Sequence, residues 1–468
     1  MAKYKTPGVY INEISSLPPS VAQVETAIPA FIGYTEKGTN VPTRMRSITE
    51  YRNGFGGPFQ KEIGKFEINK NRIITAPKIW TTPTYRMFYM LEMFFANGGG
   101  DCFIISVGNY DDGKDTVKNQ AMIEGLSLLD EEDLPTLIVF PDAASRKNSE
   151  EPAELYKAAL AQCAKRKDRF LICDVEESKK QTNTISESAI EFRFAIGMND
   201  LKYGAAYFPS LLTTLTYTSA DDKIKVMLND EKHVLRHREE SILEDPNKNE
   251  SSLYHKDDGK YKDLYLEIKK IIDGIKLELP PSAAVAGAYT RVDNSRGVWK
   301  APANVSLNKV MAPTLKINDM EQADLNISST GKSINAIRSF VGQGVMIWGA
   351  RTLAGNDNEW RYISVRRFFN MVEKSVKKAS ERFVFEPNDA NTWIKIKAMI
   401  ENYLNTLWRA GALGGAKPEH AYFVNVGLGQ TMTAYDTQEG NLIVEIGLAP
   451  VRPAEFINLR FSLKMQKS

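Results

Sequence analysis

The chain has 468 residues, 43% of them apolar and 25% charged, which suits a globular protein of two or three domains. Its 60 basic and 58 acidic residues give a net charge of +2, which argues against a protein whose main role is to coat nucleic acid. The cysteines Cys102, Cys163 and Cys173 lie in apolar stretches and form no C-x-x-C pair, so we expect buried, inert thiols rather than disulfides or a zinc site.

The N-terminal segment lacks the apolar region of a secretion signal, and no uncharged apolar run approaches the roughly 20 residues that span a bilayer. We therefore expect synthesis in a reducing interior. Any later release from the cell would need a route other than classical export.

The first 35 residues are predicted to be extended. Val9, Tyr10 and Ile11 lie in an alternating pattern that is typical of a short strand, and residues 27–34 form a second apolar strand candidate. Helical and strand patterns then alternate along the chain. Helices are predicted over 83–96, 116–129 and 152–165, and strands over 102–107, 136–140 and 169–175, with a further helix and strand within 192–207. Strands separated by helices of this length predict crossover units and a mainly parallel sheet.

Residues 221–278 differ from the rest of the chain in composition. They contain 12 basic and 15 acidic residues, and three of the four histidines also lie there. Because such a segment has few apolar residues to bury, we predict a solvent-facing insertion that is partly helical near residues 265–275.

The C-terminal part returns to regular apolar patterning. Residues 366–383 predict an amphipathic helix, and a second helix is capped by Asn388 or Asp389 and closed by Gly411. Strands are then predicted over 421–426, 441–448 and 455–463, the last with strict alternation of apolar and polar residues.

Several short motifs suggest ligand sites but fail on spacing. The segment 329–333 resembles the end of a phosphate-binding loop, but position 326 is Asn where that motif needs Gly, so we favour a capped helix that begins after Ser333. His233 and His237 lack the Glu that follows the first His of a zinc-protease helix, and we expect both to be solvated. The sequence therefore predicts no catalytic residues, no cofactor and no metal site.

Seven segments, in order along nearly the whole chain, resemble the contractile tail-sheath family of phages and phage-like injection systems. They are 6–13, 94–100, 279–287, 296–304, 348–353, 360–363 and 449–456. Only the charged insertion and parts of 36–80 fall outside the resemblance.

The resemblance implies a mixed α/β and α+β fold with a conserved inner domain and a variable outer α/β domain. It also implies hexameric rings that stack helically around an inner tube. The expected domains are an N-terminal arm with a strand of the inner domain (1–35), an outer α/β domain (36–280) that carries the charged insertion 221–278, an inner sheath domain (281–440) and a C-terminal strand arm (441–468).

Both ends of the chain carry strand patterns that have no evident local partner. An unpaired strand edge is adhesive, and adding it to a neighbouring copy's sheet satisfies its backbone groups and builds rings or helices rather than closed dimers. The alternative is that both strands pair within their own subunit. The residues predicted to form these inter-subunit strand arms are Val9, Tyr10, Ile11, Leu442, Val444, Ile446, Ile457, Leu459 and Phe461.

The segment 366–382 carries six basic residues against Glu373 and Glu381, a net charge of +4. Related sheaths are similar in gripping their tube through a charged helix, so this helix is the candidate contact with an acidic inner tube; a solvated helix face is the alternative. The six residues are Arg366, Arg367, Lys374, Lys377, Lys378 and Arg382.

The predicted function is therefore that of a structural subunit, not an enzyme. It would polymerise around a tube and contract to drive that tube through a target envelope. Expected partners are further copies of the chain, the inner tube protein, baseplate and cap proteins, and paralogous sheath subunits, without nucleic acid or membrane insertion. Assembly is expected in the cytoplasm of the producing cell. Alternatives are a baseplate or cap component with a sheath-like fold that does not contract, and a nucleotide-driven enzyme that uses Lys332.

Overall fold

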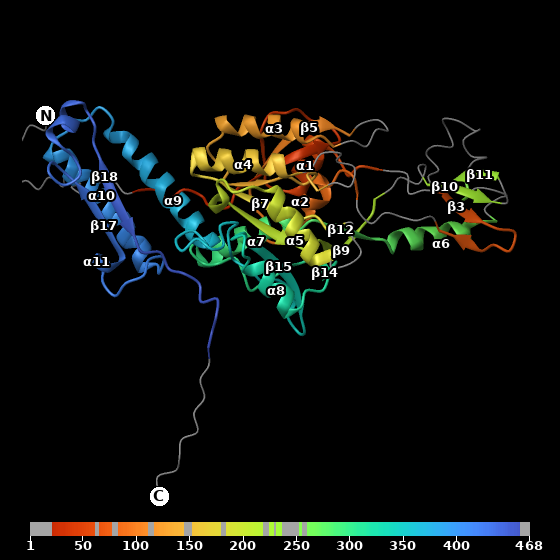
Figure 1. The fold of residues 1–468 in the computed structure, drawn as a ribbon. Coiled ribbons are helices and arrows are strands. Elements are labelled where there is room, and N and C mark those ends of the chain that lie inside the picture. The colour runs from red at the N-terminus through yellow and green to blue at the C-terminus, as the bar shows by residue number, and fades with distance from the viewer. Residues whose placement is uncertain are drawn as a thin grey trace, which may run out of the picture. The chain divides into compact units, whose positions relative to one another are not determined.

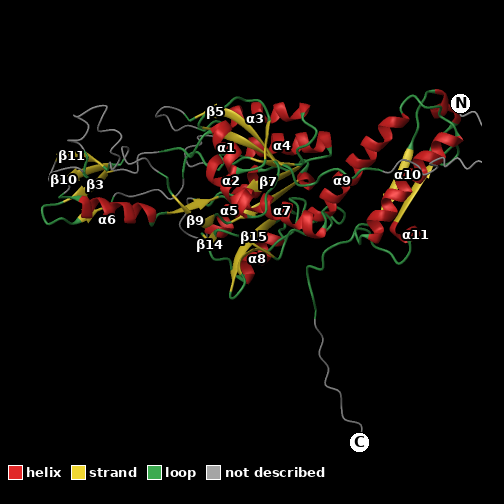
Figure 2. Cartoon of the chain, turned by 180° about the vertical axis from the view of Figure 1, so that it is seen from behind, coloured by secondary structure: helices red, strands yellow, loops and turns green. Residues whose placement is uncertain are grey.

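The computed structural model describes residues 21–60, 65–76, 83–110, 117–144, 152–178, 184–218, 224–228, 231–235, 252–254 and 260–458. Helices and strands alternate through most of this length, as Figures 1 and 2 show from opposite sides. The described residues divide into two compact units, one formed within 25–371 together with 452–458, and the other by 21–24 together with 372–451. No helix of the described residues is both long and apolar enough to cross a membrane.

A nine-stranded sheet forms the centre of the larger unit, in the order β13-β16-β15-β8-β7-β6-β1-β5-β2. Its strands are β1 (Pro29–Thr35), β2 (Thr43–Met45), β5 (Cys102–Asn109), β6 (Leu137–Val139), β7 (Phe170–Asp174), β8 (Gly204–Phe208), β13 (Val305–Ser306), β15 (Ile334–Phe340) and β16 (Gly344–Ile347). The six strands from β15 to β5 run parallel, and β2, β13 and β16 pair antiparallel at the two edges. The predicted parallel sheet is confirmed.

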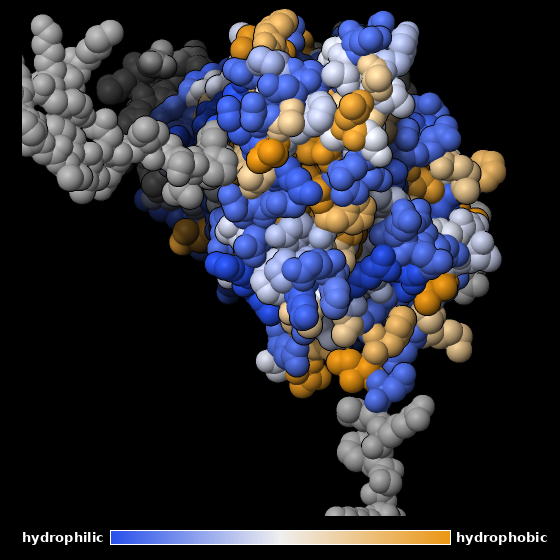
Figure 3. All heavy atoms as spheres, turned by 90° about the vertical axis from the view of Figure 1, so that its left-hand side faces the viewer, coloured by the Kyte–Doolittle hydropathy of each residue, from blue (hydrophilic) through white to orange (hydrophobic). Residues whose placement is uncertain are grey.

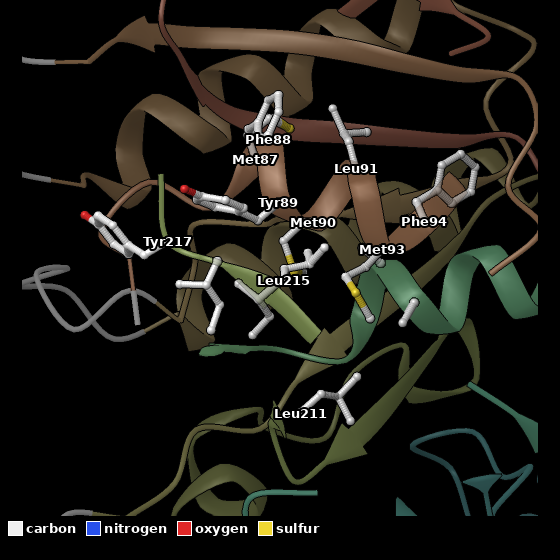
Figure 4. Packing of buried hydrophobic residues seen from close by; sticks show 14 of the residues in the cluster. Met87, Phe88, Tyr89, Met90, Leu91, Met93, Phe94, Leu211, Leu215 and Tyr217 are labelled. Atoms are coloured by element: carbon white, nitrogen blue, oxygen red, sulfur yellow. The ribbon is translucent and has the colours of Figure 1, made fainter. Parts of the chain in front are cut away.

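Helices cover both faces of this sheet because alternate side chains of each central strand point to opposite faces. Phe31 packs with α2 and α7 in one buried cluster, whereas Ala30 and Ile32 pack with α3 and α4 in the other. Figure 4 shows the first cluster, where side chains of α2 and of β9 pack together. The helices around this sheet are α1 (Ile48–Phe55), α2 (Met87–Ala96), α3 (Asn119–Leu128), α4 (Ala153–Arg166), α5 (Thr184–Ala195), α7 (Ser282–Arg296) and α8 (Asp319–Asn326).

The helices α2 and α7 approach each other closely at Gly287. A Cβ atom at this position would collide with the backbone oxygen of Phe94 and with Asn97. The surrounding turns of α7 are also built from small buried residues, among them Ala284 and Ala288. Gly287 therefore fixes the distance between the two helices, since any side chain there would push them apart.

Two smaller sheets also belong to the larger unit. One has the order β12-β9-β14 and the other the order β11-β10-β3-β4. Their strands are β3 (Lys65–Ile68), β4 (Ile74–Thr75), β9 (Leu211–Thr216), β10 (Lys225–Leu228), β11 (Glu231–Val234), β12 (Lys276–Leu279) and β14 (Val310–Pro313).

The charged segment 221–278 is more structured than the sequence suggests. Its strand β10 pairs with β3, which comes from residues far away in the sequence, and α6 (Lys262–Asp273) buries Leu264 and Ile268. Among the described residues, Val226 and Leu253 are also buried in this core. The prediction that this segment has little to bury is therefore wrong for its described residues, because most of their apolar side chains are buried in one core with those of β3. The predicted helix is confirmed.

The smaller unit contains a two-stranded sheet of β17 (Tyr422–Val426) and β18 (Val444–Leu448) with α10 (Ala390–Arg409), α11 (Pro418–Ala421) and α12 (Ala434–Gln438). The helix α9 (Ile363–Ser380) begins in the larger unit and ends in this one. Asp389 caps α10 by accepting a hydrogen bond from the Thr392 amide at 2.9 Å, as the sequence predicts. The predicted strands 421–426 and 441–448 are confirmed within a few residues.

One expectation is corrected by the fold. Residues 334–340 form β15 rather than a helix after Ser333, because they fill the sheet position beside β8. The two compact units divide the chain at Val24/Glu25, Met371/Val372 and Val451/Arg452. The expected domain division near residues 35, 280 and 440 stays a prediction. The strand predicted over 27–34 is confirmed as β1, which lies between β5 and β6 inside the large sheet.

Candidate assembly interface

The sheet of β17 and β18 leaves both of its outer edges without a strand partner in the described part of the chain. The two strands pair antiparallel from Tyr422–Leu448 to Val426–Val444. Val424 and Val426 are buried on the face that meets α10, whereas Phe423 is half exposed on the other. An isolated two-stranded sheet is marginal in water, and its open edges present N–H and C=O groups that a further strand can bind.

The open face of this sheet carries an aromatic ring over a glycine. Phe423 pairs directly with Gly447 across the strands, and a Cβ atom at Gly447 would collide with the Phe423 ring. The ring therefore covers the backbone of β18 where a side chain would otherwise stand. This contact leaves an exposed aromatic ring next to the open edge.

Val444 and Ile446 therefore have a partner strand within their own chain. The expectation that this strand pattern lacks a local partner is corrected, because the loop between 427 and 443 folds back and places β18 beside β17. Leu442 lies half-buried just before β18. That these residues pair with a neighbouring subunit stays a prediction. Such pairing would use the edge of β18 that does not face β17.

The other predicted arm residues lie mostly outside the described part of the chain. Val9, Tyr10, Ile11, Leu459 and Phe461 fall in ranges that the structure does not describe. Ile457 is described, and its side chain is exposed on a segment that is neither helix nor strand.

Glu455 fixes the segment that leads into the predicted C-terminal arm. Its carboxylate accepts hydrogen bonds from Arg351 at 2.7 and 3.0 Å, from Asn326 at 2.6 Å and from Tyr362 at 3.1 Å. Arg351 is buried and also donates to the Gly355 carbonyl at 3.1 Å. A carboxylate held by a bidentate guanidinium and two further donors is among the stronger polar contacts in proteins.

The pKa of Glu455 reflects this arrangement. Burial acts to raise the pKa, but the hydrogen bonds from Arg351 and Asn326 outweigh it, so the pKa lies below its ordinary value. Sequence reasoning missed this cluster. Its signal was present, because Arg351 and Glu455 lie in two segments, 348–353 and 449–456, that carry the family resemblance, although the sequence does not show that they meet.

The basic helix divides into a buried and an exposed part. Arg367 is 3% exposed, forms an ion pair of 2.5 Å with the equally buried Asp293 and lies over the Tyr289 ring. Arg366 is 2% exposed and lies over the ring of Trp360 at 4.2 Å. Assigning these two arginines to a tube-binding surface is wrong, because both are enclosed by the larger unit.

The remaining four basic residues of that prediction lie towards the end of α9 and just after it. Lys377, Lys378 and Arg382 are exposed and Lys374 is half-buried. Figure 3 shows a predominantly hydrophilic face of the molecule, with hydrophobic residues in small groups between hydrophilic ones. These four residues remain the candidate contact with a tube.

In the motifs that suggested ligand sites, the described side chains contact other parts of the chain. Lys332 is buried and donates to the Arg193 carbonyl, while Arg193 donates to the Lys332 carbonyl at 3.0 Å. His233 is buried within 3.5 Å of Glu231, so the expectation that it is solvated is wrong; His237 lies outside the described residues. The three cysteines are buried, as predicted. Within the described ranges, His, Cys, Asp and Glu side chains form no group suited to a metal ion.

Comparisons with known proteins match most of the chain to tail sheath proteins. The model of the phage tail sheath protein central domain matches residues 116–353, and that of the phage tail sheath C-terminal domain matches 355–464. The tail sheath proteins of Vibrio phage KVP40 and Enterobacteria phage T4 are each 26% identical over 46% of this chain. These matches span only 30% and 31% of the two relatives' own length.

Solved structures match the chain over almost its whole length. The sheath of the extracellular contractile injection system PVC, in the contracted state, is 30% identical, with a TM-score of 0.66 and coverage of 99% of this chain and 98% of that one. The helical sheath of the anti-feeding prophage, also contracted, is 31% identical, with a TM-score of 0.64 and coverage of 98% and 99%.

Proposed function

The chain belongs to the phage tail sheath family, and we propose that it is a structural subunit of a contractile sheath. In this role, copies of the chain polymerise helically around an inner tube, and contraction of the lattice drives the tube through a target envelope. The subunit works by packing and needs no catalytic residue or cofactor. Its partners are further copies, the inner tube protein and baseplate and cap proteins, and it assembles in the producing cell before acting as part of an extracellular particle.

The observation that carries this proposal is the two-stranded sheet of β17 and β18 with both edges open in the described residues. The segments 9–11 and 455–463 carry the predicted strand patterns, and strands from neighbouring copies would pair with these edges. Each copy then gives strands and receives strands, a head-to-tail contact that propagates instead of closing. The ion pair of the half-buried Glu455 with the buried Arg351 would hold the C-terminal arm to its own subunit, so that pulling on the arm moves the whole unit.

Contraction in this scheme follows from packing energies alone. A preference of about 1 kcal/mol per subunit for the contracted lattice shifts a single subunit only about fivefold. Because shared strands make neighbouring copies move together, the preferences of many copies add. We expect the subunit to move largely as a rigid body, with the change absorbed near Pro18-Pro19, Gly38 and Gly440. The positive φ of 77° at Gly440, with no atom within 4 Å of its Cβ position, suits a loop that can change conformation.

Co-expression of the chain with its inner tube protein tests the proposal. Negative-stain microscopy should show striated sheaths of uniform diameter around the tube. A variant that ends after Asn458 lacks the predicted arm strand and should remain unassembled, while its thermal unfolding should match that of the intact chain. Sheaths of normal length and regularity from the shortened chain would contradict the proposed strand exchange.

A further inference from the structure

The helix α5 has two faces of different character. Ser188, Ala189 and Arg193 are buried against the larger unit. Ile190 and Phe194, four residues apart and therefore on one side of the helix, are exposed, and Phe194 reaches 89% exposure. Single exposed apolar side chains are common on protein surfaces. Two of them side by side, with further apolar residues nearby, indicate an interaction site.

Arg193 ties α5 to the turn that ends α8. Its guanidinium donates to the backbone oxygens of Asp324 at 2.6 Å and Leu325 at 3.2 Å, and its side chain is 5% exposed. The mutual hydrogen bonds between Arg193 and Lys332 add a second attachment. The outer face of α5 is therefore held rigidly, which lowers the entropy lost when a partner binds it.

The same turn also receives the base of the C-terminal arm. Asn326, the residue after Leu325, donates to Glu455 at 2.6 Å. Three exposed apolar side chains flank this contact: Ile327 directly follows Asn326, and Phe456 and Ile457 directly follow Glu455. Phe456 is 67% and Ile457 77% exposed. Arg193 and Glu455 bind consecutive residues of the last turn of α8, so one end of α5 and the arm base are attached to the same turn.

We propose that these five residues form one contact surface, the arm-base surface, and that it binds a second copy of this chain. Its members are Ile190, Phe194, Ile327, Phe456 and Ile457. The inference rests on the proposed function and deepens it, because it assigns a side-chain contact to the subunit that accepts the arm. Strand exchange alone involves only backbone edges and their alternating side chains.

The choice of a second copy follows from chain geometry. If the strand predicted over 455–463 pairs with a neighbouring copy, its residue Leu459 is only two positions beyond Ile457. An extended chain advances about 3.3 Å per residue, so the neighbour's sheet begins within about 7 Å of Ile457 along the chain. A copy that accepts this strand must therefore lie against the surface from which the strand departs. Glu187 and Glu191 on α5 disfavour an anionic lipid surface as the occupant.

A photocrosslinking residue at position 194 tests the proposal in assembled particles. We expect p-benzoylphenylalanine at this position to crosslink to a second copy of the chain after assembly, and to give no such product with unassembled subunits. The variant Phe194→Glu should lower the yield of assembled sheath at least tenfold while leaving the thermal unfolding midpoint unchanged. The matched control is Ile73→Glu, an exposed isoleucine in the turn between β3 and β4, which should assemble normally.

The possible failures can be told apart. Failure of the unaltered chain to form sheaths would reject the proposed function itself. Normal assembly of Phe194→Glu, or crosslinks from position 194 only to the tube protein or to lipid in assembled sheaths, would reject the arm-base surface and leave the proposed function intact.

Discussion

The nine-stranded sheet of the larger unit and the two-stranded sheet of the smaller unit contain strands of similar length but are completed in different ways. Every central strand of the large sheet is paired on both sides and covered by helices on both faces. In the described residues, β17 and β18 have only each other and are covered by α10 on one face. The central strands of the large sheet therefore have no free backbone edge, whereas β17 and β18 each keep one edge whose backbone groups a further strand can satisfy.

The same contrast holds for charged groups on one helix. Arg367 is enclosed with Asp293, so its charge is part of the folded unit. Lys377 and Lys378, three turns later, face solvent and are available to a partner. Burial, and not residue type, therefore separates the charges that stabilise the subunit from those that can serve assembly.

Removing one member of the buried pair should give the largest effect. Arg367→Ala leaves the Asp293 carboxylate buried without its partner, and we expect a loss of about 3–5 kcal/mol in the free energy of unfolding. The control Lys377→Ala should change it by less than about 0.5 kcal/mol. Urea denaturation of the two purified variants measures both values. Equal losses of unfolding free energy in the two variants would contradict the distinction between buried and exposed charges on α9.

Two glycine substitutions should separate folding from assembly. Gly287→Ala places a Cβ atom against the backbone of α2, which cannot yield easily, so we expect a loss of about 1–3 kcal/mol in unfolding free energy. Gly447→Ala displaces the half-exposed Phe423 ring, which is able to turn into solvent, and should cost less than Gly287→Ala. Calorimetry of the soluble variants and microscopy of their assemblies test this; we expect Gly447→Ala to impair assembly more than folding.

Two carboxyl groups of the larger unit should respond to pH in opposite directions. Burial raises the pKa of Asp174 to about 7, although Ser282 donates two hydrogen bonds to it. The folded chain therefore binds more protons than the unfolded chain between about pH 4 and pH 7, and this group's contribution to stability falls as pH rises through that window. Asp174→Asn should make the decline in stability over this range shallower.

Glu455 acts in the other direction because its pKa is lowered in the folded chain. Its contribution is present above its unfolded pKa and is lost as pH falls through the folded value. Glu455→Gln should therefore reduce the loss of stability on acidification. Denaturation midpoints of both variants between pH 3 and pH 8 provide the measurement, and parallel curves for variants and unaltered chain would refute the assignment.

The smallest expected effect concerns the exposed basic residues. Replacing Lys377, Lys378 and Arg382 with Ala should weaken binding to an acidic inner tube by about tenfold at low salt, since exposed ion pairs contribute about 0–1 kcal/mol each. Salt should reduce the difference between the variant and the unaltered chain. Co-sedimentation with tubes over a range of ionic strength tests this, with no change at any salt concentration as the contrary outcome.

The sequence by itself determined those features that depend on local pattern. The alternation of apolar strands and helices predicted the parallel sheet, and the cap at Asp389 and the helix around it followed from side-chain chemistry within a few residues. The family resemblance was likewise readable from short segments in order. Each single element, cap or resemblance segment among these signals lies within about twenty consecutive residues.

Only the tertiary structure decided which distant segments meet. Residues 334–340 have a helix-start motif before them, yet the free position beside β8 makes them a strand. Residues 65–68 complete the core of the charged segment, and Asp293 encloses Arg367, so neither burial could be inferred from local composition. Pairing of β18 with β17 and of Glu455 with Arg351 likewise depends on loop closure over many residues, because long-range contacts leave no periodic trace in the sequence.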